Sequence, residues 1–309
     1  MKRQIRTAVV TGPTGAIGTA LCGLLVQNGV SVCAVARPGS RRSAHLAQMD
    51  GVAVLPCDAS ALSRLPDRLP CADAFFHLAW AGTTGAGRND MPAQIDNIRY
   101  TIDAVRAAAA LGCRVFVGAG SQAEYGRADG ALSPDTPCFP ENGYGMAKLC
   151  AGQMSRVECE RLGVDHIWPR ILSVYGPWDG EGSMISSTIR KLLAGERPVL
   201  SAGTQLWDYL YADDAAEALF RMAVFGKSGA VYPLGGGVAR PLSHYIRAMR
   251  DAIDPALPLG FGEIPFGSRQ VMRLEADISA LRNDTGFEPR TDFETGIRKT
   301  IKWMKEQKP

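Results

Sequence analysis

Short apolar segments alternate with helical patterns from residue 7 to about residue 176, and this alternation constrains the fold more than any other feature. A strand followed by a helix and a further strand builds a parallel sheet with helices on both faces. We therefore predict a doubly wound α/β domain. Its strands are expected at 7–12, 31–37, 52–58, 72–80, 114–120 and 165–175, and its helices at 15–29, 40–49, 91–112 and 144–163, with a short one near 60–66.

After residue 176 the alternation loosens. Helical patterns are expected at 183–194, 212–225, 242–252, 277–285 and 293–306, and brief strands near 230–234, 261–264 and 271–275. We predict a dinucleotide-binding domain over 1–176 and a smaller α/β substrate lobe over 177–309, interleaved with it. This lobe is expected to close over the carboxyl ends of the strands, where open α/β sheets bind ligands.

Composition narrows the class of partner. The 309 residues are 46% hydrophobic and 21% charged, which is typical of a globular protein, and the net charge is only +3. We expect neither a nucleic acid nor a membrane partner, because acidic and basic residues are interspersed. The eight cysteines include no CxxC pair, so a reduced cytoplasm is expected and no metal site is predicted. A small molecule remains as the expected partner.

A glycine-rich turn follows the first strand and opens the first helix. Gly12, Gly15 and Gly18 give the spacing GxxGxxG, one residue longer than the common dinucleotide fingerprint. Such glycines permit a tight turn and a close backbone approach to a pyrophosphate, which the positive end of the helix favours. The turn therefore predicts a Rossmann sheet that binds a nicotinamide dinucleotide.

The second strand ends in Arg37 rather than in an acidic residue. An NAD-selective site commonly has a carboxylate there for the ribose 2′-hydroxyl. Arg37, followed by Ser40, Arg41 and Arg42, suits a 2′-phosphate instead, because a guanidinium matches phosphate oxygens. NADP is favoured over NAD on this ground, and a solvated basic loop is the alternative.

Tyr144 and Lys148 are four residues apart in a predicted helix, so both side chains lie on one face. An ordinary tyrosine has a pKa near ~10 and exchanges protons poorly at neutral pH. Lys148 is expected to lower that pKa with its positive charge. Ser121 follows the carboxyl end of the fifth predicted strand, where ligands meet side chains. The three residues predict proton transfer to or from a substrate oxygen.

These motifs resemble the extended short-chain dehydrogenase/reductase family, in its branch of nucleotide-sugar epimerases, dehydratases and reductases. The likeness rests on the glycine turn, Ser121 followed by Ala-x-Tyr-Gly, Tyr144-x-x-x-Lys148, and Arg170-x-x-Ser-x-Tyr-Gly-Pro. It covers nearly the whole chain. The resemblance implies that Tyr144 transfers the proton, that Lys148 also holds the nicotinamide ribose, and that Ser121 binds the reacting oxygen.

The resemblance also assigns a wider set of contacts. Cofactor contacts are expected from Gly12, Thr14, Gly15, Ala16, Ile17, Gly18, Arg37, Asp58, Ala59, Leu78, Ala79, Trp80, Asn97, Tyr144, Lys148 and Ile171, and substrate contacts from Gln122, Glu124, Ser173, Trp207 and Arg273. His77 has apolar neighbours and is expected to be a packed core residue.

Three departures from the family pattern bear on the activity. Gln122 and Ala123 stand where family dehydratases carry an acid pair, which argues against a 4,6-dehydratase, although Glu124 could be recruited as an acid or base. Ser173 replaces an asparagine. Trp207 replaces an arginine that clamps the substrate diphosphate, so that Arg269 or Arg273 takes over this contact or the substrate differs; Trp207 itself stacks on a substrate ring or packs in the core.

The leading hypothesis is an NADP-dependent reductase of a keto group on a nucleotide-activated deoxysugar. The alternative is a nucleotide-sugar epimerase with tightly bound NAD, and a remote one is a cofactor-sensing protein without catalysis. A homodimer through the helices at 91–112 and 144–163 is also expected, because the alanine-rich stretch at 104–111 lets helices approach closely.

Overall fold

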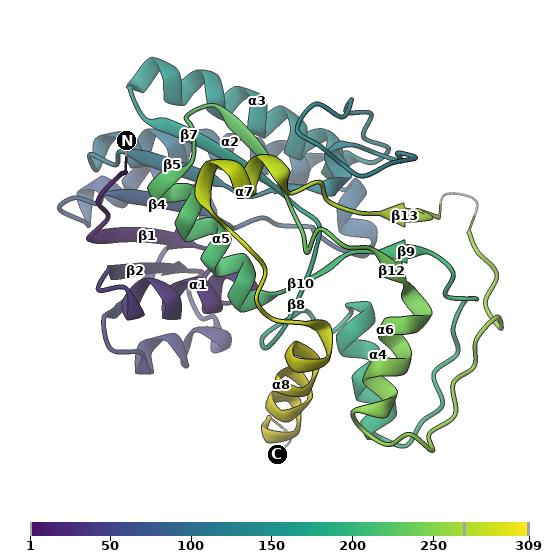
Figure 1. The fold of residues 1–309 in the computed structure, drawn as a ribbon. Helices are drawn as coiled ribbons and strands as arrows, with labels where there is room; N and C mark the ends of the chain where they lie inside the picture. The colour runs from purple at the N-terminus through teal and green to yellow at the C-terminus, as the bar shows by residue number, and fades with distance from the viewer. Residues whose placement is uncertain (1, 268–269, 308–309) are drawn as a thin grey trace.

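The predicted parallel sheet forms the centre of the computed structural model, which describes residues 2–267 and 270–307. The strand order is β11-β7-β5-β4-β1-β2-β3, and β6 extends the sheet beside β7 (Figure 1). Its strands are β1 (Thr7–Thr11), β2 (Ser31–Ala36), β3 (Val52–Pro56), β4 (Ala74–His77), β5 (Val115–Gly118), β6 (Gly120–Ser121), β7 (Asp165–Ile171) and β11 (Ala230–Leu234). The doubly wound fold is confirmed.

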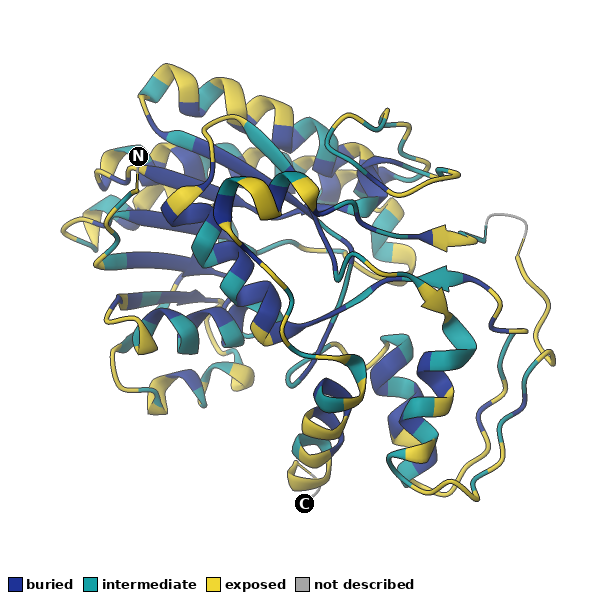
Figure 2. Ribbon diagram, viewed as in Figure 1, coloured by how far each residue is buried: buried dark blue, intermediate teal, exposed yellow. Residues whose placement is uncertain are grey.

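Helices cover both faces of this sheet. On one face α1 (Ala16–Gln27) packs against α5 (Ala212–Phe225), and on the other α2 (Met91–Ala110) packs against α3 (Gly143–Leu162). The central strands β1, β4, β5 and β7 are almost entirely buried, as Figure 2 shows in dark blue, whereas the edge strand β3 has no fully buried residue. Burial on both faces explains why the central strands are apolar runs without polar alternation.

The second half of the chain builds a smaller lobe and also returns to the sheet. The lobe contains β8 (Ser173–Tyr175), β9 (Leu206–Trp207), β10 (Tyr209–Tyr211), β12 (Arg240–Pro241), β13 (Arg273–Leu274), α4 (Met184–Leu193), α6 (Leu242–Asp251) and α8 (Phe293–Glu306). Helices α4, α6 and α8 share a separate apolar core. By contrast α5, β11 and α7 (Ser279–Thr285) belong to the layers of the main sheet. The division at residue 176 remains a proposal.

Several predicted elements differ from the structure. The helix expected at 40–49 is wrong: two short 3₁₀ turns, η1 (Arg41–Ser43) and η2 (Leu46–Gln48), occupy this segment after the turn at Gly39. The strand expected at 261–264 is also wrong, because this segment forms a turn in which Gly262 has a φ of +80°. The short helix near 60–66 is a 3₁₀ helix, η3 (Ala59–Asp67).

Two strands are shorter in the structure than predicted. The strand expected at 72–80 is only β4, because the chain leaves the sheet after His77. The strand expected at 165–175 divides at Leu172 into β7, which lies in the main sheet, and β8, which pairs with β10. In the described part of the chain, no helix is long and apolar enough to cross a membrane.

Alanine substitutions at two glycines of α1 are expected to change stability in opposite directions. A methyl group at Gly18 would overlap the Gly12 carbonyl oxygen and lie 2.7 Å from the Pro13 Cα, whereas one at Gly23 would have nothing within 4 Å. We expect Gly18→Ala to lower the free energy of unfolding by roughly 1–3 kcal/mol through overpacking. Gly23→Ala, the matched control, should raise it by about 0.5–1 kcal/mol through helix propensity. Urea unfolding measures both, and an unaffected Gly18→Ala protein would refute the close approach.

Candidate active site

A cavity of about 520 Å³ opens at the carboxyl ends of β1 and β4, where the strand order reverses. This is the position at which open α/β sheets bind ligands. Nine of the predicted cofactor residues line it: Gly12, Thr14, Gly15, Arg37, Ala59, Leu78, Ala79, Trp80 and Asn97. Of the others, Ala16, Ile17 and Gly18 continue into α1, and Asp58 caps η3 by accepting a hydrogen bond from the Ser60 amide (3.1 Å). The structure thus gathers most of the predicted nucleotide site.

The glycine turn leaves the start of α1 open toward this cavity. Gly15 is the N-cap residue, no side chain caps the helix, and a methyl group at Gly15 would have nothing within 4 Å. Gly12 has a φ of +68°, and a methyl group there would lie 2.7 Å from the Ala79 amide nitrogen. Uncapped amides at a helix start favour an anion, so these residues fit the pyrophosphate of a dinucleotide.

The rim of the cavity beside β2 is basic. Arg37, Ser40 and Arg42 line it, and none of the described residues that line the cavity is acidic. The Arg42 guanidinium donates to the carbonyl of Trp178, which belongs to the segment after β8. A basic, hydroxyl-bearing rim suits a phosphate group better than a ribose hydroxyl.

Helix α2 supports the loop that follows β4. Asn97 accepts from the Ala81 amide (3.0 Å) and donates to the Ala81 carbonyl (2.9 Å), while Gln94 accepts from the Trp80 indole (2.9 Å). Both side chains are buried. Asn97 therefore lines the cavity while its amide is engaged with the loop. Gln94 was missed in the sequence, although its spacing of three from Asn97 places both on one helix face.

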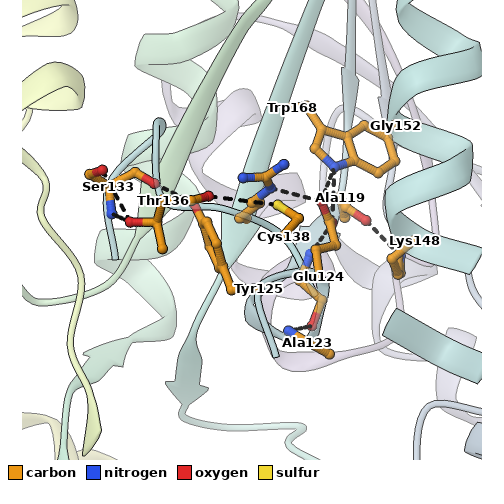
Figure 3. Close-up of polar contacts among 12 residues, drawn as sticks. Ala119, Ala123, Glu124, Tyr125, Ser133, Thr136, Cys138, Lys148, Gly152 and Trp168 are labelled. Carbon is orange, nitrogen blue, oxygen red and sulfur yellow. Dashed lines mark hydrogen bonds and ion pairs between the residues drawn. The ribbon is translucent and has the colours of Figure 1, made fainter. Parts of the chain in front are cut away.

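Ser121, Tyr144 and Lys148 converge at the start of α3. The Lys148 ammonium is buried and donates to the Ala119 carbonyl at 2.6 Å (Figure 3). It also lies 3.6 Å from the centre of the Trp80 ring. The Trp80 and Tyr144 rings meet edge to face at 6.2 Å. Ser121, at the end of β6, is buried close enough for its hydroxyl to act on the Tyr144 phenol. The predicted group of three is thus assembled beside the cavity.

The pKa of Tyr144 is raised, mainly because burial disfavours the phenolate. Ser121 and the Arg88 guanidinium oppose this shift, and Glu124 adds to it. Burial also lowers the pKa of Lys148 to about 7, against the attraction of Glu124. The expected effect of Lys148 on the pKa of Tyr144 stays a prediction, because burial dominates that pKa and the groups that oppose the rise are Ser121 and Arg88.

Glu124 was predicted to contact substrate, and the structure places it elsewhere. Its side chain is fully buried and accepts from the Ser121 amide (2.8 Å), the Trp168 indole (3.0 Å) and the Arg170 guanidinium (2.8 Å), as Figure 3 shows for Trp168. Its oxygens are already engaged, so the prediction for Glu124 is corrected to a structural role. The sequence did not reveal this because Arg170 is 46 residues away.

Three of the remaining predicted substrate residues, Ser173, Trp207 and Arg273, lie in strands β8, β9 and β13 of the lobe. The Trp207 indole donates to the Ser173 hydroxyl at 2.8 Å. The two positions at which the chain differs from the family's asparagine and arginine are therefore bonded to each other. Arg273 is exposed, pairs with Glu275 at 2.6 Å, and lies in β13 beside β9, which contains Trp207. Gln122 begins η5 (Gln122–Glu124) and is partly exposed. Ile171 ends β7 and packs against the core. Arg269 lies outside the described residues.

The family that these features define is confirmed by comparison with known proteins. The family described as "NAD dependent epimerase/dehydratase family" matches residues 8–235. The chain belongs to this family.

The individual sequence relatives share less than a third of their residues with this chain. A dTDP-glucose 4,6-dehydratase of Xanthomonas campestris pv. campestris is 28% identical over 184 residues, which is 56% of this chain and 52% of that protein. The chain thus spans about half the length of the curated relatives it matches.

Solved structures match over almost the full chain. The UDP-N-acetylglucosamine 4-epimerase of Methanobrevibacter ruminantium has a TM-score of 0.88 with 24% identity and covers 100% of both chains. MoeE5, solved with UDP-glucuronic acid and NAD, has a TM-score of 0.83 with 27% identity and covers 97% of this chain and 99% of its own.

The buried ion pair between Glu124 and Arg170 is expected to contribute to stability. Glu124→Gln leaves the Arg170 charge buried without its partner, which typically costs about 3–5 kcal/mol of unfolding free energy. The control Glu263→Gln removes the exposed pair with Arg197 and should leave stability unchanged within error. Chemical denaturation compares the two variants. Equal stabilities would show that Glu124 does not hold the strands as described.

Proposed function

We propose that this chain is an NADP-dependent reductase that reduces a keto group on a nucleotide-activated deoxysugar. The observation that supports it best is the convergence of Ser121, Tyr144 and Lys148 beside a cavity with an open helix start and a basic rim. A half-buried tyrosine that exchanges a proton and a cavity that fits a dinucleotide are the two parts that a carbonyl reduction needs.

The roles of the chain's own residues follow from their positions. Tyr144 delivers a proton to the substrate oxygen, and Ser121 holds that oxygen with its hydroxyl. Lys148, anchored to the Ala119 carbonyl, fixes the distance between α3 and the end of β5 and faces the dinucleotide. The bound cofactor would supply the hydride.

The preference for NADP rests on Arg37, Ser40 and Arg42. A reductase releases its oxidised cofactor and binds NADPH again at every turnover. Guanidinium groups that contact the 2′-phosphate would select NADPH over NADH. Similar solved structures contain NAD, among them MoeE5, and NAD therefore remains the competing cofactor.

Epimerisation is the second candidate function. The similar structures include 4-epimerases, among them one named for UDP-N-acetylglucosamine and one named for UDP-glucose. Dehydration, the activity named for the sequence relatives, is opposed by a specific observation. Gln122 and Ala123 carry no acid, and the buried carboxylate of Glu124 is engaged with Trp168 and Arg170.

Cofactor titration tests the proposal. We expect exchangeable NADPH binding about 10-fold or more tighter than NADH binding, monitored by fluorescence. Arg37→Gln should remove most of this preference and leave NADH affinity nearly unchanged. Arg41→Gln is the matched control, because Arg41 belongs to the same loop but does not line the cavity. Copurified NAD that does not exchange would instead support the epimerase.

We also propose a homodimer and a cytoplasmic location. The eight cysteines are all free thiols, consistent with a reducing compartment. Helices α2 and α3 expose the large apolar side chains Met91, Ile95, Met146, Met154 and Val157. Such a patch commonly marks an interface.

The oligomeric state can be measured by sedimentation. We expect a dimer at micromolar concentration and a monomer for Val157→Glu, because the charge would be buried between subunits. Val238→Glu, at a similarly exposed valine in the other lobe, should remain dimeric. A monomeric parent protein would contradict the proposal.

A further inference from the structure

The loop between β4 and α2 is held in a fixed shape. Gln94 donates to the carbonyls of Gly82 (3.0 Å) and Gly87 (2.9 Å). Gly82 has a φ of +67°, and a methyl group there would lie 2.6 Å from the Gly87 carbonyl oxygen. The loop therefore folds back on itself, and its second half, η4 (Gly85–Asn89), is positioned by a buried side chain.

The same loop is fastened to the start of α3. Asn89 accepts a hydrogen bond from the Gly143 amide at 3.0 Å. A methyl group at Gly143 would lie 3.1 Å from the Arg88 carbonyl oxygen, so the absence of a side chain permits the approach. Arg88 is consequently held next to Tyr144, although the two residues are far apart in the sequence.

The Arg88 side chain lies over the face of Tyr144. Its guanidinium carbon is 4.5 Å from the centre of the phenol ring, and the residue is half-buried. Within the described residues Arg88 forms no ion pair, and its one hydrogen bond, to the Thr83 carbonyl, is long at 3.4 Å. Its charge is thus directed at the ring rather than neutralised by a carboxylate.

Lys148 is less well placed to supply that charge. Its ammonium is 5.9 Å from the centre of the Tyr144 ring, against 3.6 Å from Trp80, and is bonded to the Ala119 carbonyl. Burial lowers its pKa to about 7, which disfavours its charged form at the alkaline pH where a tyrosine ionises. An arginine stays charged throughout that range.

We propose that Arg88 is a positioning residue whose permanent charge, held over the Tyr144 ring by the Gln94 and Asn89 contacts, stabilises the phenolate. The proposal rests on the role of Tyr144 as the proton carrier under the proposed function. It names a residue that none of the motifs contains. The other charged or titratable groups that face Tyr144 are Glu124 from η5 and Lys148 from α3, with Ser121 from β6 as a hydroxyl.

The test is a pH titration of Tyr144 by NMR, in the full chain as isolated and labelled at the tyrosine Cζ carbons. The signal that disappears in Tyr144→Phe assigns the resonance. Because a cation favours the phenolate, Arg88→Gln should raise the pKa of Tyr144 by roughly half a unit to one unit. Arg88→Lys, which keeps the charge, should shift it less, and Lys148→Met should also shift it less than Arg88→Gln.

Arg99→Gln provides the matched control, because Arg99 lies 5.2 Å over the ring of Tyr100 on α2 and should leave the Tyr144 titration unchanged. An unshifted titration in Arg88→Gln would overturn the proposal, as would a larger shift in Lys148→Met. The measurement needs neither substrate nor added cofactor. A failure here is therefore distinct from a failure of the reductase proposal, which the cofactor titration tests.

Discussion

The buried carboxylate of Glu124 is the interaction on which the geometry of the candidate site depends. It binds the Ser121 amide at the end of β6 and, at the same time, the Trp168 and Arg170 side chains of β7. The Trp168 ring in turn lies against Gly152 of α3, where a methyl group would be 2.7 Å from the indole. The Glu124 side chain therefore fixes the position of Ser121. Through Trp168, it also fixes the distance between β7 and α3, the helix that contains Tyr144 and Lys148.

Trp80 joins the cofactor end of the site to its catalytic end. It lines the cavity, its indole is anchored by Gln94, and its ring faces Lys148 and Tyr144. This packing excludes water from the ammonium, which explains why the pKa of Lys148 is as low as about 7. Burial thus favours the neutral form of Lys148. The loop between β4 and α2 places a second cation, Arg88, over the Tyr144 ring.

The sequence was most informative where local pattern and chemistry coincide. Apolar runs fully buried between helices predicted the sheet, and the glycine turn with Tyr144 and Lys148 predicted the site, since each depends on neighbours within a few residues. Contacts between distant segments could not be read in this way. Glu124 binds Arg170 of the neighbouring strand β7, 46 residues later in the chain, and Arg88 approaches Tyr144 where the loop passes close to Gly143. The helix expected at 40–49 failed similarly, because tertiary contacts such as the stacking of His45 on Trp178 determine that segment.

Transfer of a labelled hydride distinguishes a reductase from an epimerase. NADPH carrying deuterium at the transferable position would be incubated with a panel of nucleoside-diphosphate keto-deoxysugars, and the sugar products would be analysed by mass spectrometry. We expect one product to gain a single deuterium as NADPH is consumed in equal amount, and Tyr144→Phe to slow this transfer by about 10²-fold or more. A nucleotide sugar that changes configuration without consuming NADPH or gaining deuterium would contradict this expectation.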